Sequence, residues 1–270
     1  MSETTAPVLT ELPDPGVALL RLNRPARSNA MDLDSIALLH QAIDRVSADP
    51  SVRAIVLVGN GAAFCAGLDL KAILDETGAL RLDSGTGYEL QERYEGTIRR
   101  LRRSDKAVIA AVNGPAVGFG FALTLGADIR LASTAASFHV GAVRIGLTAG
   151  ECGISYHLPR LVGASRAFEL MLTGRPVDAA EAERIGLVAR VVPPEQLVSQ
   201  ALECARQVLR NSPFATRHTK RVMWANLDAA SLETAVELEN RAQVLGLQSG
   251  DFAEAARAFV DKRAPNFAGG

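Results

Sequence analysis

The chain has 270 residues, of which 48% are hydrophobic and 22% are charged, and its formal net charge is −1. This composition is typical of a globular protein with one large core, and the small net charge argues against a dominant role in nucleic-acid binding. The three cysteines, Cys65, Cys152 and Cys204, are scattered and odd in number, which indicates reduced thiols in a cytosolic protein rather than a disulfide framework.

Two segments bear on cellular location. The N-terminal sequence MSETTAPVLTELPD has neither the basic region nor the apolar region of a secretory signal, so we expect a cytoplasmic protein. Residues 107–127 carry no charge, but Asn113, Pro115 and several glycines interrupt this run. A buried strand and a buried helix joined by a turn explain the run better than a membrane span does.

Strand and helix patterns alternate in the first two-thirds of the chain. The segments VALLRL (residues 17–22) and AIVLVG (residues 54–59) predict strands, with a helix over residues 33–47 between them. Residues 76–87 predict a flexible loop before a helix over residues 88–103. This alternation predicts an α/β fold with much parallel pairing. The later elements expected here are strands over residues 108–112, 129–132, 137–138 and 187–192 and helices over residues 163–172 and 179–185.

The last part of the chain has only helical patterns. No low-complexity tract separates it from the part before. We therefore expect an α/β core that carries the ligand site over residues 1–200 and a C-terminal helical region over residues 201–270. The helices expected from residue 195 onward cover residues 195–211, 213–224, 232–247 and 252–262.

Two of the expected strands lead into turns that are rich in glycine. GAAFCAGLDL (residues 61–70) follows the strand over residues 54–59, and NGPAVGFG (residues 113–120) precedes a helix of small and apolar residues. Such turns leave backbone N–H groups open at a helix N-terminus, where they suit a group with developing negative charge on oxygen. The two turns together predict an oxyanion hole, although glycines also serve tight turns and close packing without any ligand.

Several motifs match one protein family in their order and spacing. On these motifs the chain resembles the crotonase superfamily, also called the enoyl-CoA hydratase/isomerase family. The resemblance implies a crotonase-like α/β spiral of repeated ββα turns with a C-terminal helical trimerisation region, assembled as a homotrimer or as a dimer of trimers, which is a hexamer. The motifs are LNRPARSNA (residues 22–30), FCAGLDL (64–70), AVNGPAVGFG (111–120), LTGRPVDAAEAERIGLV (172–188) and AFVDKRAPNF (258–267).

The resemblance also implies the ligand, an acyl-CoA thioester, with coenzyme A present as part of the substrate and no separate cofactor. In the family two backbone N–H groups hold the thioester oxygen, and by motif they fall at Leu68 and Phe119. A glycine is usual at the second position, so the Phe119 side chain must point away from the thioester. Arg27 and Lys262 have the alternative reading of solvated surface charges. The further substrate and coenzyme A contacts that the resemblance implies are Arg27, Ala66, Gly67, Asp69, Leu70, Gly118 and Ala142, together with Phe259 and Lys262, which in the family reach a neighbouring subunit's ligand.

Typical hydratases of this family use two glutamates, and this sequence has neither of them. Ala122 and Ala142 stand at the corresponding positions. Glu151, in TAGECGIS, matches an aspartate of relatives that resemble dienoyl-CoA isomerases, so we expect it to act as the general acid/base. One base suffices for a 1,3-proton shift, since it can remove and return the same proton. The alternative is that Glu151 only occupies the first turn of a helix that runs toward residue 161, where negative charge is favourable.

Other candidates for chemistry are weaker. His139 is a second candidate base, and Asp69 is an acidic residue near the expected hole, but a structural role is commoner for each. Ser137 lies close to His139 in sequence, yet the G-x-S-x-G motif of serine hydrolases is absent. The sequence also lacks CxxC, HExxH and P-loop patterns, so a metal site is unsupported.

The sequence therefore predicts an acyl-CoA enzyme of the enoyl-CoA hydratase/isomerase type, a lyase or isomerase of fatty acid metabolism. The single expected carboxylate favours isomerisation over hydration. The alternative is a non-catalytic acyl-CoA-binding homologue that has lost the usual glutamates. The orientation of Glu151 separates the two hypotheses, because a catalytic carboxylate must face the thioester.

Overall fold

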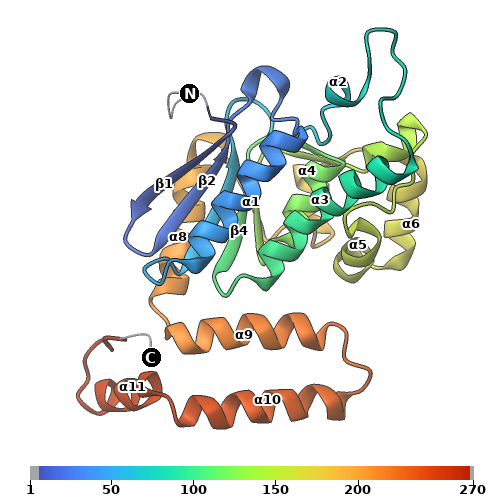
Figure 1. Ribbon diagram of the computed structural model, residues 1–270. Helices are drawn as coiled ribbons and strands as arrows, with labels where there is room; N and C mark the ends of the chain where they lie inside the picture. The colour runs from blue at the N-terminus through green and yellow to red at the C-terminus, as the bar shows by residue number, and fades with distance from the viewer. Residues whose placement is uncertain (1–5, 268–270) are drawn as a thin grey trace.

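The main sheet of the protein has six strands in the order β1-β2-β3-β4-β6-β9 (Figure 1). The structure is a computed structural model that describes residues 6–267. The first five residues of the N-terminal sequence MSETTAPVLTELPD therefore lie outside the described residues. Every neighbouring pair in the sheet is parallel except β1 with β2. The strands are β1 (Val8–Asp14), β2 (Val17–Leu22), β3 (Ala54–Gly59), β4 (Ala107–Val112), β6 (Ile129–Ser133) and β9 (Arg190–Val192).

The central strands are buried on both faces, as their continuous apolar sequences predict. β3 is buried at every position. Alternate side chains of β2, such as Leu20 and Leu19, enter two separate hydrophobic clusters on opposite faces of the sheet. One cluster packs against α8 (Leu197–Leu209). The other is covered by α1 (Leu33–Ala48), α3 (Ser84–Arg103) and α4 (Phe119–Gly126).

A second, smaller sheet carries the remaining strands, in the order β5-β7-β8. β5 pairs with β7 in parallel and β7 pairs with β8 antiparallel. The first strand of this sheet, β5, follows the turn after β4 and directly precedes α4. Its pairing with β7 therefore helps to fix the chain that leads into α4. The elements of this part are β5 (Pro115–Val117), β7 (Ser137–His139), β8 (Val177–Asp178), the 3₁₀ turn Gly141–Ile145, and the helices α2 (Leu70–Ile73), α5 (Ile154–Val162), α6 (Ala164–Thr173) and α7 (Ala179–Arg184).

Some boundaries differ from the sequence expectations. The sequence patterns predict no strand at residues 8–14, yet β1 pairs with β2 there. α3 begins at Ser84 rather than residue 88, because the Asp83 side chain accepts a hydrogen bond from the Thr86 N–H at 2.8 Å and caps the helix. The helix expected over residues 195–211 is divided into the 3₁₀ turn Pro194–Gln196 and α8.

The C-terminal helices α9 (Pro213–Asn226), α10 (Leu232–Leu247) and α11 (Gly250–Val260) form a layer on one side of the α/β core (Figure 1). The expected boundary at residue 200 falls inside α8, which packs against β3 and β4. Among the helices of residues 6–267, none has both the length and the apolar character that crossing a bilayer requires.

A buried ion pair joins this layer to the core. Lys220 of α9 lies 2.9 Å from the Asp128 carboxylate, which follows α4 in the chain. The Lys220 ammonium also donates hydrogen bonds to the carbonyls of Leu101 and Lys106, and the Trp224 indole N–H donates to Asp128 at 2.7 Å. The same carboxylate accepts the backbone N–H of Val108. Both charges are therefore hydrogen-bonded, as burial of an ion pair requires.

Candidate active site

The two glycine-rich turns meet in space and are joined by backbone hydrogen bonds. The Val117 N–H donates to the Cys65 carbonyl at 2.9 Å, and the Cys65 N–H donates to the Pro115 carbonyl at 3.2 Å. A Cβ atom on Gly120 would lie only 2.0 Å from the Cys65 carbonyl oxygen, so only glycine fits at this position. The first turn of α4 is thereby held directly against the turn that follows β3.

The N–H groups of Leu68 and Phe119 are free to bind a ligand. Within residues 6–267, neither group donates to a protein acceptor. Phe119 is the first residue of α4, where a backbone N–H has no partner inside the helix. The turns converge here, since a Cβ atom on Gly67 would lie 3.4 Å from the Phe119 nitrogen and 2.7 Å from the Val117 carbonyl oxygen. Gly67, with φ +90°, therefore makes room for both candidate donors.

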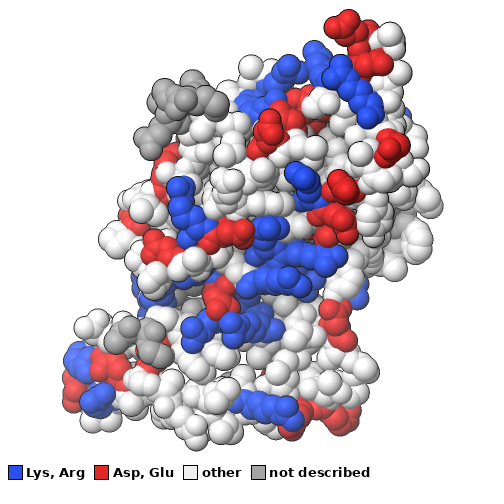
Figure 2. Space-filling view, in the orientation of Figure 1, with Lys and Arg blue, Asp and Glu red and all other residues white. Residues whose placement is uncertain are grey.

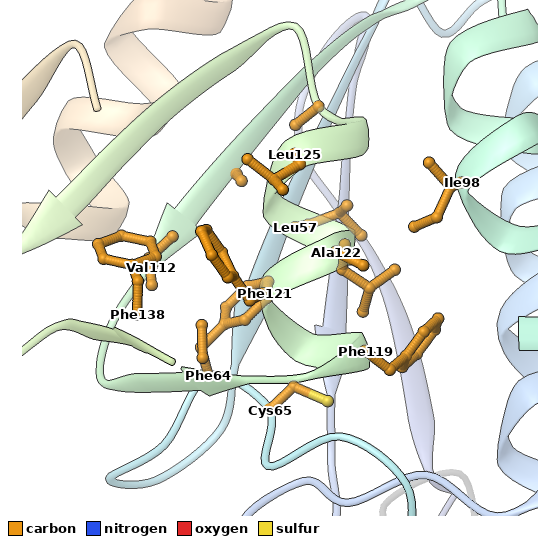
Figure 3. Packing of buried hydrophobic residues seen from close by; sticks show 14 of the residues in the cluster. Leu57, Phe64, Cys65, Ile98, Val112, Phe119, Phe121, Ala122, Leu125 and Phe138 are labelled. Atoms are coloured by element: carbon orange, nitrogen blue, oxygen red, sulfur yellow. The ribbon is translucent and has the colours of Figure 1, made fainter. Parts of the chain in front are cut away.

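The Phe119 side chain packs toward α3. It leaves the first turn of α4 on the side that faces Ile98 of α3, while Phe121 lies on another side of the helix (Figure 3). Its ring makes an edge-to-face contact with Tyr94, with ring centroids 4.9 Å apart. Only 2% of the residue is exposed. The large side chain is therefore accommodated against α3.

A pocket of about 190 Å³ opens beside these two N–H groups. It collects eight of the residues that the sequence predicts for the site. It also includes residues of α3 that sequence reasoning missed, although the spacing of Leu90, Tyr94, Ile98 and Leu101 marks the inward face of that helix. The predicted residues in its wall are Ala66, Gly67, Leu68, Leu70, Gly118, Phe119, Ala142 and Glu151, and the others are Leu90, Gln91, Tyr94, Val117, Gly141, Ile145, Leu147 and Cys152.

Glu151 faces the pocket from the turn before α5. Gly118 directly precedes Phe119 in the chain. The Glu151 Oε1 atom lies 3.1 Å from the position that a Cβ atom on Gly118 would occupy. Burial raises the pKa of the Glu151 carboxyl to about 7. α5 begins at Ile154, so the expectation that Glu151 opens this helix is wrong.

The raised pKa of Glu151 makes stability depend on pH. Because the ordinary value is 4.5 and the folded value is about 7, the folded state binds this proton more tightly than the unfolded state. The stability from this group is present below pH 4.5 and is lost as pH rises through about 7. Relative to Glu151→Gln, we expect the free energy of unfolding of the wild type to fall by about 2 kcal/mol between pH 5 and pH 8, allowing for partial contact with solvent. Urea denaturation of both proteins measures this difference, and a difference that does not change with pH would contradict a buried carboxyl.

The two alanines at which the resemblance implies the glutamates of hydratases have different surroundings. Ala142 lies in the pocket wall, on the 3₁₀ turn that follows β7. Ala122 is fully buried in α4 within the hydrophobic core (Figure 3). A carboxylate at residue 142 would enter the pocket, whereas the methyl group of Ala122 contributes to packing.

Asp69 and Arg27 lie at the rim of the site rather than in the pocket wall. The Asp69 carboxylate is buried and pairs with Arg24 at 3.0 Å, and Arg27 approaches it at 3.8 Å. Arg24, which sequence reasoning did not single out, also pairs with Asp32 at 2.9 Å. Next to this cluster, the Asp69 N–H donates a hydrogen bond to the Met31 carbonyl. The ion pairs and this hydrogen bond together fix the turn that carries Leu68.

Phe259 and Lys262 do not approach the pocket of their own chain. They lie at the end of α11, in the layer on the far side of α9 (Figure 1), and Phe259 is 86% exposed. His139 is also outside the pocket wall. The His139 ring is hydrogen-bonded to the Ser137 hydroxyl at 2.8 Å. The His139 carbonyl accepts a hydrogen bond from the Gly118 N–H at 3.0 Å, so this residue supports the backbone before Phe119.

Lys and Arg side chains gather across the middle of one face of the molecule (Figure 2). The basic end of α3 contributes to this band, but its residues have partners away from the pocket. Arg100 pairs with Asp44 at 3.1 Å, and the Arg102 guanidinium lies over the Trp224 ring at 4.3 Å from the ring centroid. Among the described residues, no group of three or more His, Cys, Asp or Glu side chains is placed to hold a metal ion.

Tyr94 connects α3 to the turn that carries the first candidate donor. Its buried hydroxyl donates to the Met31 carbonyl at 2.5 Å. We expect Tyr94→Phe to lower the free energy of unfolding by about 1 kcal/mol, because this hydrogen bond is lost while the same carbonyl keeps the Asp69 N–H. Chemical denaturation measures the change. A loss near zero would show that the hydroxyl does not stabilise this contact.

A mostly parallel sheet covered on both faces, a second small sheet and a layer of C-terminal helices define an α/β protein with its pocket at the junction of two strand-to-helix turns. Residues 14–270 match the family described as "Enoyl-CoA hydratase/isomerase". The chain belongs to this enoyl-CoA hydratase/isomerase family and is an enzyme of the hydratase/isomerase type. The resemblance to the crotonase superfamily is thereby confirmed.

Individual relatives agree with this assignment. The "Probable enoyl-CoA hydratase EchA12" of Mycobacterium tuberculosis H37Rv is 46% identical over 98% of this chain and 93% of its own length. The "1,2-epoxyphenylacetyl-CoA isomerase" of Escherichia coli K12 is 35% identical over 94% of this chain and 95% of its own.

A solved structure confirms the fold class. The crystal structure of a probable enoyl-CoA hydratase/isomerase from Mycobacterium abscessus matches with a TM-score of 0.89 at 41% identity. The match covers 97% of this chain and 99% of that one. A monofunctional enoyl CoA isomerase from M. smegmatis matches with a TM-score of 0.74 at 43% identity, over 86% of this chain and 99% of that one.

Proposed function

We propose that the protein moves the double bond of an enoyl-CoA thioester. One observation carries this proposal: among the described residues, Glu151 is the only carboxylate in the pocket wall. Ala122 and Ala142 stand where hydratases of the family have glutamates, so a water molecule would lack the pair of carboxylates that activates it. The solved structure from M. smegmatis that is named as a monofunctional enoyl CoA isomerase is consistent with this reaction.

The proposed chemistry uses the backbone to hold charge and Glu151 to carry the proton. The N–H groups of Leu68 and Phe119 donate to the thioester oxygen and stabilise the enolate that forms when a proton leaves carbon. The Glu151 carboxylate takes that proton from one carbon and returns it to another, so the double bond moves while the atoms balance. A pKa of about 7 suits this role, because the group both accepts and donates near neutral pH.

The substrate is proposed to be an acyl-CoA in which coenzyme A is part of the substrate and no further cofactor takes part. Arg27, which is partly exposed beside Asp69, would face the phosphates of coenzyme A. Phe259 and Lys262 would contribute to the site of a neighbouring subunit in a homotrimer or a dimer of trimers. The exposed apolar side chains of α10 and α11, including Leu232, support such contacts. The free thiols of all three cysteines are consistent with a cytoplasmic protein.

Mass spectrometry of acyl-CoA thioesters in heavy water tests the proposal. Saturated, 2-enoyl, 3-enoyl and dienoyl thioesters are incubated with the wild type and with Glu151→Gln. We expect deuterium uptake and a double-bond shift in the wild type and neither in the variant. Formation of a water adduct would contradict the proposed isomerisation and would identify the reaction as hydration. Tight binding with no chemistry in either protein would support the non-catalytic acyl-CoA-binding role instead.

A further inference from the structure

A second cavity, of about 620 Å³, lies between α9 and the α/β core. It shares no lining residue with the pocket that holds Glu151. Its wall combines aliphatic side chains of the core and of the C-terminal helices with basic and aromatic groups. The residues that matter here are Arg130 of β6, His157 and Leu161 of α5, and Met223, Trp224 and Leu227 of α9 or its end.

The His157 side chain lines this cavity and has no hydrogen-bond partner among the described residues. Only 4% of the residue is exposed, and within residues 6–267 neither ring nitrogen has a hydrogen-bond partner. The ring makes an edge-to-face contact with Trp224, with ring centroids 5.5 Å apart. Burial and the nearby arginines lower the pKa of His157 to about 4, so the ring is neutral and carries one N–H donor. The ring nitrogens are not among the described side-chain atoms that are shielded from solvent without a partner, so this N–H is open to the cavity, where a ligand or water can accept its hydrogen bond.

Arg130 is the second group that points to a ligand. Its guanidinium donates to the carbonyls of Leu187 at 2.9 Å and Ala127 at 2.8 Å. In the part of the chain that the structure describes, no carboxylate lies within 4.0 Å of it. Asp128 is near, but its carboxylate already accepts from Lys220, Trp224 and the Val108 N–H. Burial lowers the pKa of Arg130 to about 10, and the charge of the nearby Asp128 carboxylate opposes this shift.

We propose that this cavity binds a carboxylate that carries an apolar chain. The carboxylate lies between the Arg130 guanidinium and the His157 ring, where both groups can donate to its oxygens. The chain lies along Leu161, Met223 and Leu227, beside the face of the Trp224 indole. Charge complementarity fixes the headgroup, and apolar burial favours the chain over a small anion such as acetate. The site is independent of the thioester pocket and of the proposed isomerase reaction.

Trp224 gives a direct readout, because it is the only tryptophan in the chain. Octanoate is titrated into the full chain in its native assembly while Trp224 fluorescence is recorded, and calorimetry measures binding independently. 1-Octanol is the uncharged match and acetate is the match without a chain. We expect saturable binding of octanoate, and an affinity at least about tenfold lower for 1-octanol and for acetate. A substrate-like acyl-CoA that fills the other pocket should not compete.

Two pairs of variants separate this site from a general effect on folding. Arg130→Gln should weaken octanoate binding about tenfold or more, while Arg130→Lys, which keeps the charge, should retain most of it. His157→Phe keeps a ring beside Trp224 and removes the donor, so it tests the site even if Arg130→Gln does not fold. Equal affinities for octanoate and 1-octanol, no saturable change, or full competition by the acyl-CoA would overturn the proposal. Trp224 fluorescence that changes with protein concentration alone would also overturn it, by showing that a second copy of the chain covers the cavity.

Discussion

Replacing Glu151 with Gln should lower kcat for double-bond isomerisation by about 10²–10⁴-fold, the usual contribution of a general acid/base. The amide keeps the shape of the side chain beside Gly118 but cannot accept the proton that leaves the substrate. KM should change much less than kcat, because the thioester oxygen is held by the backbone. Steady-state kinetics with the thioester that shows isomerisation in heavy water measures both constants.

Glu92→Gln is the matched control for this variant. Glu92 is an exposed carboxylate on α3 and lies outside the pocket wall, so its loss should leave kcat unchanged. Near-normal turnover in Glu151→Gln would contradict the role proposed for Glu151.

Gly67→Ala should reduce kcat/KM by about 10²–10³-fold, as expected when one donor of an oxyanion hole is lost. The added methyl group would stand 2.7 Å from the Val117 carbonyl oxygen and 3.4 Å from the Phe119 nitrogen, so the two turns must separate. Leu68 and Phe119 could then no longer hold one oxygen between them. Kinetics and the binding of a non-reactive acyl-CoA measure the loss, which should fall mainly on kcat.

Gly78→Ala separates this effect from the strain of the backbone itself. Gly78 has φ +81°, close to the +90° of Gly67, but nothing lies within 4 Å of its added Cβ atom. Its substitution should therefore affect stability slightly and leave turnover unchanged. Equal activity losses in the two alanine variants would show that the approach of the turns is not what matters.

The central sheet could be predicted from sequence because buried parallel strands have continuous apolar runs. β3 and β4 were expected within a residue of their observed bounds. β1 was not predicted, because its sequence VLTELPD contains a proline and alternates irregularly between apolar and polar residues. Its pairing with β2 depends on the turn between the two strands, which the sequence of β1 does not indicate. The start of α3 depended on one cap, Asp83, inside a segment that otherwise has the composition of a loop.

The candidate site was predicted by motif rather than by periodicity. The family resemblance named Leu68, Phe119 and Glu151, and the structure brings all three to one pocket. It could not indicate that Phe119 would rest against Tyr94, because that contact joins segments far apart in the chain. The pKa of Glu151 was equally beyond the sequence, since a helix terminus and burial act in opposite directions and only the packed structure decides between them.

The close approach of Gly120 to the Cys65 carbonyl has a consequence for changing the enzyme by directed evolution. The two turns are held together by main-chain atoms, whereas the wall that would surround the acyl group comes from side chains such as Leu90, Gln91, Ile145 and Leu147. Libraries that vary those four positions can therefore explore new acyl groups while every clone keeps the same pair of amide donors. Diversity placed in the glycines themselves would mostly yield proteins in which the turns no longer meet.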